Sequence, residues 1–243
     1  MNDSPFDRFA DGNLTALTAA QNAGLSIFTG KGHCNTCHSG AEFTAESVGN
    51  LAKTGLISRM QMGNGKPAVY DVGFYNIGVR PTAEDLGVGA KNTLGLPMSL
   101  TRLAQSGANV GTTLKPPISP TERVAVDGAF KVPSVRNVEL TGPYFHTGGM
   151  ATLEQVVDFY SRGGDFHEAN IDNLDPRIEN LALSANEKAN LVAFLKSLTD
   201  ERVRFSKAPF DHPQLVLPNG PEIPAVGKDG GAAAQPFAAT LAP

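Results

Sequence analysis

The sequence predicts a mainly α-helical domain with long glycine- and proline-rich loops and a few short β-strands. Two amphipathic segments, at about residues 18–29 and 184–198, each begin with a capping motif and carry apolar residues on one face. The 26 glycines and 17 prolines among 243 residues are too many for a bundle of long helices, so we expect ordered loops between the helices. The alternating stretch at 68–79 is the main sign of β-structure.

Composition limits the class of protein and its partners. A hydrophobic fraction of 41% and a charged fraction of 18% are typical of a globular chain. The net charge of −4, without clustered Lys and Arg, gives no reason to expect nucleic-acid binding. No apolar run approaches the roughly 18 residues of a membrane span. We predict a lead-in at 1–13, one domain at 14–206 and an extended Pro/Gly/Ala-rich tail at 207–243.

The first predicted helix lies directly before the chain's two cysteines. Thr18 can cap it while Gln21 reaches back to the Thr18 backbone, which is the pattern of a capping box. Gly24 leaves room for a close crossing with another helix. Gly30 and Gly32 interrupt the pattern, so the helix should end there.

Further elements are expected in the rest of the chain. Between residues 40 and 130 the pattern is weak, with a short helix predicted around 98–106 and a loop at 111–122. Thr152 caps a helix that Gly163 ends. One face of that helix should carry Leu153, Val156, Val157 and Tyr160. A second capping box, Ser184 with Glu187, opens a helix whose apolar stripe is Leu191, Phe194, Leu195 and Leu198.

The stretch HCNTCHSG, residues 33–40, holds both cysteines of the chain. A zinc site would need two more ligands, and neither a second CxxC nor an HxxxH motif is present. A redox CxxC would follow a strand and open a helix, whereas here a helix ends before the motif. A disulfide that encloses only two residues gains little loop entropy and is strained.

Covalently attached haem c uses every residue of the motif. Cys34 and Cys37 have the spacing for thioether bonds to the two vinyl groups, and His38 is placed to bind the iron from the proximal side. A capped helix before the motif and an amphipathic helix near the end are the two helices that a cytochrome c-like haem domain crosses. The pattern therefore favours one haem c in a cytochrome c-like domain.

Several stretches resemble one family. SPFDRFADGNLTALTAAQNAGLSIFTGKGHCNTCHSGAEFT, YNIGV and FKVPSVRNVELTGPYFHTGGMATLEQVVDFYSRGG are similar to the bacterial di-haem cytochrome c peroxidases and their MauG-like relatives. The resemblance runs from about residue 4 to 200. Proteins of that family have two cytochrome-like domains with one CxxCH each. The match here is to the C-terminal, electron-transferring domain only, and the peroxidatic half is missing from this chain.

The resemblance implies roles for individual residues. It places the haem attachment at Cys34 and Cys37 and the proximal ligand at His38. The family's distal ligand comes 14 residues after the His of PYFH, which leads from His146 to Tyr160. That residue is Met in the peroxidases and Tyr in MauG, so the resemblance implies His/Tyr ligation of the haem iron.

The resemblance also implies contacts around the haem. Arg136 matches a position near the haem propionates, which Arg can bind in bidentate fashion. The backbone carbonyls of Thr141 and Pro143 match two ligands of a calcium ion between the domains, whose third protein ligand belongs to the missing domain. Where MauG has a Trp used for long-range oxidation of a protein substrate, this chain has Gly32, and it has no Trp at all.

Other interpretations of these residues stay open from the sequence. Tyr160 could be a core tyrosine, and the distal position could be open or water-bound. A methionine could replace Tyr160 as ligand, the candidates being Met60, Met62, Met98 and Met150. We interpret His146 as a hydrogen-bonding structural residue. The remaining polar candidates are taken as surface histidines (His33, His167, His212) and solvated charges (Asp127, Asp158, Glu154).

Two functions follow from this interpretation. The first is a mono-haem electron-transfer domain of a di-haem peroxidase or MauG-like oxidoreductase, whose partner is a second haem domain or a redox protein. The alternative is a stand-alone mono-haem peroxidase or ligand sensor with a displaceable distal ligand. Haem attachment implies a periplasmic or extracellular location. The first 13 residues lack the basic and apolar regions of a signal peptide, so we expect a processed protein or a piece of a longer one.

Overall fold

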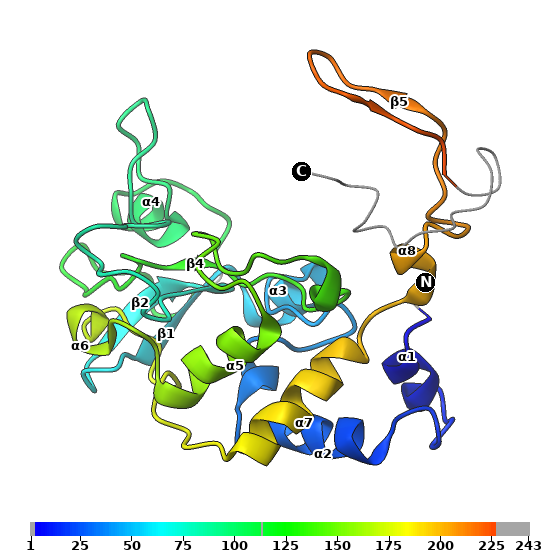
Figure 1. The fold of residues 1–243 in the computed structure, drawn as a ribbon. Coiled ribbons are helices and arrows are strands. Elements are labelled where there is room, and N and C mark those ends of the chain that lie inside the picture. Colours follow the sequence, from blue (N-terminus) through cyan, green and yellow to red (C-terminus); the bar gives the residue numbers. More distant parts are fainter. Residues whose placement is uncertain (1–2, 113, 227–243) are drawn as a thin grey trace.

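The computed structural model describes residues 3–112 and 114–226 (Figure 1). Helices account for most of the regular structure, and the strands are short. The helices are α1 Pro5–Ala10, α2 Ala19–Thr29, η1 Cys34–Thr36, α3 Val48–Thr54, α4 Leu100–Gln105, η2 Val138–Leu140, α5 Leu153–Arg162, α6 His167–Asn170, α7 Ala185–Lys196 and α8 Glu201–Arg204. The strands are β1 Ile57–Gln61, β2 Pro67–Asp71, β3 Phe74–Tyr75, β4 Phe130–Lys131, β5 Leu215–Val216 and β6 Glu222–Ile223.

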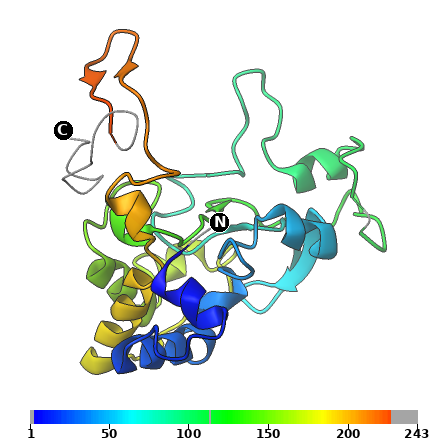
Figure 2. The same ribbon diagram turned by 90° about the vertical axis from the view of Figure 1, so that its right-hand side faces the viewer.

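Helices α2 and α7 pack closely across each other and form the centre of the helical half (Figures 1 and 2). The crossing is as close as the sequence predicts, because a Cβ atom at Gly24 would lie only 2.0 Å from the carbonyl oxygen of Asn190. Both predicted capping boxes are present, at Thr18 with Gln21 and at Ser184 with Glu187. A helix from the N-terminal part of the chain and one from its C-terminal part are thus packed together, and the cysteine motif directly follows α2.

Helix α5 packs beside α7 and begins and ends as the sequence predicts, at Thr152 and Gly163. Its buried face differs from the predicted one. The buried residues are Leu153, Val157, Phe159 and Ser161. Tyr160 is only half-buried, whereas Phe159 is fully buried and packs against Phe145, with ring centroids 4.7 Å apart.

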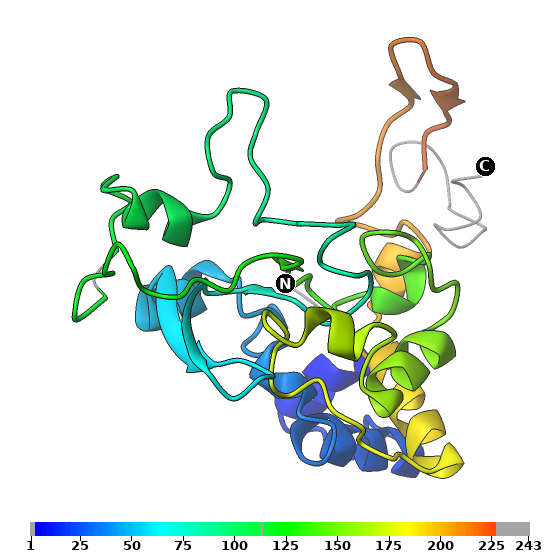
Figure 3. The same cartoon turned by 90° about the vertical axis from the view of Figure 1, so that its left-hand side faces the viewer.

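The middle of the chain forms a separate strand-rich side of the molecule (Figure 3). Strands β1 and β2 pair antiparallel with Ile57 opposite Asp71, and β3 pairs with β4. The predicted short helix appears as α4, and the predicted strands within 68–79 appear as β2 and β3. No described residue in the predicted loop at 111–122 belongs to a helix or a strand.

The two predicted flanking segments have structure of their own. Within the lead-in at 1–13, α1 is capped by Ser4. Phe6 of α1 packs edge-on against Phe43 and Phe194, with ring centroids 5.1 and 5.7 Å apart, so this segment contributes to the core. The described part of the tail forms an antiparallel hairpin of β5 and β6, and residues 227–243 lie outside the described residues. Within the described ranges, no helix is long and apolar enough to cross a membrane.

Candidate haem-binding site

The cysteine motif lies between two apolar clusters. The α2 helix ends at Thr29, and His33, with a φ of +52°, turns the chain into the short helix η1. Cys34 packs against the helical cluster, which includes Phe28, Leu153 and Leu195. Cys37 packs against a strand-side cluster that consists of Ala45, Tyr75, Val132, Met60, Tyr70 and Ile77. The two thiols therefore mark the boundary between the helical and strand-rich sides.

Both thiols are held in an apolar environment. Burial raises the pKa of Cys34 to about 12 and that of Cys37 to about 11, and the two cysteines are not joined by a disulfide. The thiols are therefore protonated at neutral pH. No group of three or more His, Cys, Asp or Glu side chains among residues 3–112 and 114–226 is arranged to hold a metal ion.

His38 is oriented by backbone carbonyls. Its Nδ1 atom lies 3.1 Å from the carbonyl oxygen of Pro133 and 3.3 Å from that of Phe43. Two acceptors at Nδ1 require the proton there, so Nε2 keeps its lone pair. Burial lowers the pKa of His38 and keeps the ring neutral. A neutral imidazole whose Nδ1–H is bound to a carbonyl is the donor that a haem iron requires on its proximal side, so the site fits a haem c.

Tyr160 lies within electrostatic range of the same motif, although it comes from α5. Burial, and then the charges of Cys37 and Cys34, raise the pKa of Tyr160 well above its usual value. Its ring packs edge-on against Phe159 at 5.3 Å and Phe145 at 6.2 Å. Its hydroxyl makes no hydrogen bond to any residue of the described chain. The fold thus brings Tyr160 close enough to Cys34 and Cys37 to interact with them electrostatically, with its oxygen unengaged.

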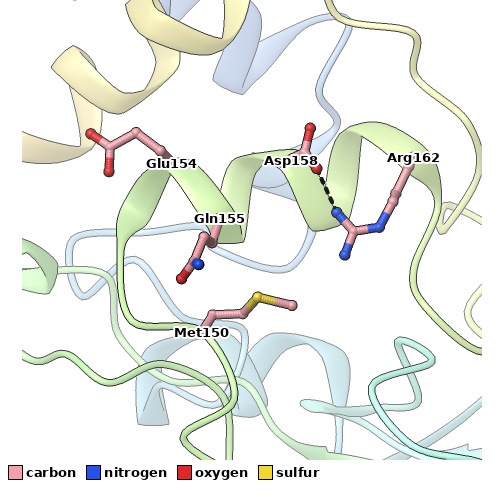
Figure 4. Close-up of a pocket in the computed structure, with 5 residues that line it drawn as sticks. All are labelled: Met150, Glu154, Gln155, Asp158 and Arg162. Carbon is pink, nitrogen blue, oxygen red and sulfur yellow. Dashed lines mark hydrogen bonds and ion pairs between the residues drawn. The ribbon is translucent and has the colours of Figure 1, made fainter.

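The four methionines considered as rival ligands lie in different environments. Met98 is 47% exposed, and Met62 is buried in a separate apolar cluster. Met60 packs in the strand-side cluster with Cys37. Met150 lines a shallow hollow on the outer side of α5, together with Glu154, Gln155, Asp158 and Arg162 (Figure 4). Met60 is thus the methionine that shares a cluster with the cysteine motif.

The charged residues of that hollow form surface ion pairs. Asp158 lies 2.7 Å from Arg162 and 2.6 Å from Lys188, and Lys188 holds the pKa of Asp158 below its usual value. Glu154 pairs with Lys196 at 3.6 Å. Outside the hollow, both carboxylate oxygens of Asp127 accept from Nη2 of Arg102 at 2.7 Å. The Asp158 and Glu154 side chains are 50% and 62% exposed, as expected for solvated charges, whereas Asp127 is 25% exposed and paired with Arg102.

Arg136 and the predicted calcium ligands lie on the segment that follows Pro133. The Arg136 guanidinium contacts Asp7 and donates to the carbonyl of Ala41 at 2.7 Å. Thr141 ends η2 and its hydroxyl donates to the Val138 carbonyl at 3.1 Å. A propionate contact at Arg136 and a calcium ion at the Thr141 and Pro143 carbonyls stay predictions.

His146 has a hydrogen-bonding environment of the predicted kind. Its Nε2 atom lies 2.8 Å from Asp85, and its ring stacks on Phe130 with centroids 3.5 Å apart. His33 is exposed, and His167 and His212 are half-exposed.

The sequence analysis did not identify the charged and aromatic residues at the strand-side edge of the site. Arg177 lies over the ring of Tyr75, with its guanidinium carbon 5.3 Å from the ring centroid, and pairs with the nearly buried Asp175. The spacing of acid and arginine in LDPRI was the available signal for this pair, but such a pattern is also common at surfaces.

Comparison with known proteins gives consistent relatives. No family model matches the chain. It is 34% identical to cytochrome-c peroxidase IdrP2 of Denitromonas iodatirespirans, over 82% of this chain and 45% of that protein. It is 29% identical to methylamine utilization protein MauG of Methylorubrum extorquens (82% and 40% covered) and 30% identical to cytochrome c551 peroxidase of Nitrosomonas europaea (83% and 41% covered).

A solved structure is similar as well. It is the crystal structure of a MauG-like protein associated with microbial copper homeostasis, with 27% identity and a TM-score of 0.55 over 86% of this chain and 51% of that one. The chain spans about half the length of the relatives it matches. Its homologues are cytochrome-c peroxidases and MauG-like proteins.

Proposed function

We propose that this chain is a mono-haem c electron-transfer domain of a di-haem peroxidase or MauG-like oxidoreductase, equivalent to the C-terminal haem domain of that family. Cys34 and Cys37 would carry the haem through thioether bonds. His38 would bind the iron on the proximal side and Tyr160 on the distal side. Covalent haem attachment gives such a protein a periplasmic location.

The orientation of His38 is the observation that carries this proposal. Its Nδ1–H is held by the carbonyls of Pro133 and Phe43, which directs the lone pair of Nε2 away from the backbone. The histidine directly follows two partly buried cysteines that have the spacing of the two haem vinyl groups.

Tyr160 supports a particular redox behaviour. Bound haem c supplies a one-electron redox couple, and a tyrosine oxygen is a hard anionic donor that favours the ferric state. A haem with this distal ligand would have a low reduction potential and would stay ferric with mild reductants.

Exposed apolar side chains support a partner domain. Two segments project from the same side of the molecule, the loop before α4 and the β5–β6 hairpin (Figures 1, 2 and 3). They carry Leu94, Leu96 and Met98 on one and Leu215, Val216 and Leu217 on the other, each at least 41% exposed. An isolated two-stranded hairpin is marginal in water, so a contact with another domain would stabilise it.

The partner we propose for these segments is a second haem domain, because the relatives are about twice as long as this chain. A calcium ion at the Thr141 and Pro143 carbonyls would belong to the same interface. Hydrogen–deuterium exchange at residues 91–97 and 212–226 should slow when the partner domain is present. Unchanged exchange would contradict this assignment.

The ligand set is tested on the ferric holoprotein. A pyridine haemochrome assay should show one haem c. The EPR spectrum of the ferric protein should be low-spin, and ascorbate should reduce little of the haem. Tyr160→Phe should open the distal position and convert the signal to high-spin. Tyr144→Phe is the matched control, because the Tyr144 hydroxyl donates to the Val138 carbonyl at 2.9 Å and should leave the spectrum unchanged. A Met–iron charge-transfer band that persists in Tyr160→Phe would assign the site to a methionine, with Met60 tested first.

A second function is favoured by the unengaged hydroxyl of Tyr160. Because no described residue holds this oxygen, it could leave the iron and admit a small ligand, as in a stand-alone mono-haem peroxidase or ligand sensor. Cyanide added to the ferric wild-type protein distinguishes the two functions. An unchanged spectrum supports electron transfer, and a rapid spectral change supports the displaceable ligand.

A further inference from the structure

A nearly buried ion pair lies at the edge of the haem site, outside the proposed ligand set. Asp175 accepts a hydrogen bond from Nε of Arg177 at 2.7 Å and from the Arg177 backbone N–H at 2.9 Å. A second guanidinium contact joins Nη2 to the other carboxylate oxygen. The Asp175 side chain is 2% exposed and that of Arg177 is 32% exposed. A carboxylate this deeply buried needs such a partner to stay charged.

The pair is anchored to the strand-side cluster. The backbone N–H of Asp175 donates to the Asn76 carbonyl at 2.9 Å, which fixes this segment beside the end of β3. The Arg177 guanidinium lies over the ring of Tyr75, with the guanidinium carbon 5.3 Å from the ring centroid. Tyr75 belongs to the same cluster as Cys37. Both charges are therefore held on the Cys37 side of the site.

The two charges act on the site in opposite directions. Arg177 carries a positive charge and Asp175 a negative one, and the pair meets the site at Tyr75, which shares a cluster with Cys37. Since the surroundings are apolar, water screens these interactions only weakly.

We propose that Arg177 is a positioning residue that keeps the haem reduction potential from falling, by neutralising the negative charge of Asp175 beside the haem. This inference rests on the proposed function, because it requires haem at Cys34, Cys37 and His38. A negative charge near the haem favours the ferric state and a positive charge favours the ferrous state. Removal of one member of the pair therefore leaves the other uncompensated, and the two removals should shift the potential in opposite directions.

The chain contains a matched control pair. Asp200 and Arg202 have the same spacing, with side chains 2% and 29% exposed, and Arg202 also lies over an aromatic ring, that of Phe210. Arg202 is on α8 and Asp200 is the N-cap of that helix, and Phe210 is outside the clusters that hold the two cysteines. Any general effect of breaking a buried Asp–Arg pair should appear equally in both places.

The experiment is spectroelectrochemical titration of the holoproteins. Arg177→Gln should raise the ferric-to-ferrous ratio at a fixed applied potential about tenfold. For a one-electron couple this corresponds to a fall of about 59 mV in the haem reduction potential. Asp175→Asn should change the ratio in the opposite direction. The haem potential of the double variant should lie between those of the two single variants, and the potential of Arg202→Gln should match that of the wild type. Equal shifts in Arg177→Gln and Arg202→Gln, or shifts of the same sign in Arg177→Gln and Asp175→Asn, would overturn the proposal.

Two further measurements keep the test decisive. If Arg177→Gln does not fold, the test rests on Asp175→Asn alone. A haem potential of Asp175→Asn that does not rise above the wild-type value would then contradict the proposal. The EPR spectrum of each variant reports whether His38 and the distal ligand are still bound. A negative haemochrome assay in the wild type would refute the proposed function, whereas an intact haem with unmoved potentials would refute only the role of Arg177.

Discussion

The Nη1 atom of Arg136 lies 2.7 Å from Oδ1 of Asp7, and this contact ties the first helix of the chain to the segment that orients His38. The two side chains are only 13% and 15% exposed. Arg136 also packs over the ring of Phe43, whose carbonyl accepts from His38. The same arginine that the family resemblance assigns to the haem propionates therefore has a structural partner within the protein.

Replacement of Arg136 tests which role it has. Arg136→Gln should lower the free energy of unfolding by about 2 kcal/mol, because Asp7 loses a charged partner in a largely buried position. Asp7→Asn combined with Arg136→Gln should cost less than the sum of the single changes, as measured by urea unfolding of the holoproteins. An unmoved haem potential in Arg136→Gln agrees with the ion pair, and a clear shift would instead support the propionate contact.

The close crossing of α2 and α7 should not tolerate a side chain at Gly24. A Cβ there would lie 2.0 Å from the Asn190 carbonyl oxygen and 2.7 Å from the Cβ of Phe194. Gly24→Ala should therefore destabilise the protein by about 1–3 kcal/mol, because the helices must separate. Gly49→Ala, in α3 with open space around it, is the control and should be neutral or stabilising by about 0.4–1 kcal/mol. Equal urea midpoints for the two variants would contradict the packing described.

The Glu187 carboxylate should make the stability of the folded protein depend on pH in the acidic range. The backbone N–H of Ser184 and then the ammonium group of Lys31 lower the pKa of Glu187 to about 2, from a usual value of 4.5. A lowered carboxylate pKa contributes stability above pH 4.5 that is lost as the pH falls toward 2. Glu187→Gln should thus have a lower Tm than the wild type at pH 7, with the difference disappearing near pH 2. A difference that is constant with pH would rule out the charge as its cause.

His146 should affect stability without affecting the iron. Its contacts are Asp85 and the face of Phe130, so His146→Gln should cost about 1 kcal/mol through the lost hydrogen bond. The low-spin EPR signal expected for the wild type should be retained. Conversion of this variant to a high-spin spectrum would mean that His146, and not only Tyr160, acts at the distal side.

The lead-in and the distal residues show where sequence reasoning was insufficient. Residues 1–13 have a polar composition, and nothing in the pattern indicates that Phe6 inserts between Phe43 and Phe194. The helical pattern on α5 likewise placed Tyr160 on the buried face, whereas Phe159 is the buried residue. In both cases, which side chain is buried depends on partners far away in the sequence, and local periodicity does not contain that information.

The sequence by itself determined the features that depend on neighbouring residues. These are the capping boxes at Thr18 and Ser184, the helix ends at glycines, and the CxxCH spacing that predicts haem c. Only the tertiary structure decided which groups meet around the motif, such as the Pro133 carbonyl at His38 and the Asp175–Arg177 pair at Tyr75. The physical reason is how far apart along the chain the interacting residues are. Caps and motif spacing are set within one or two turns of the chain, whereas burial and electrostatic environment are set by segments that only folding brings together.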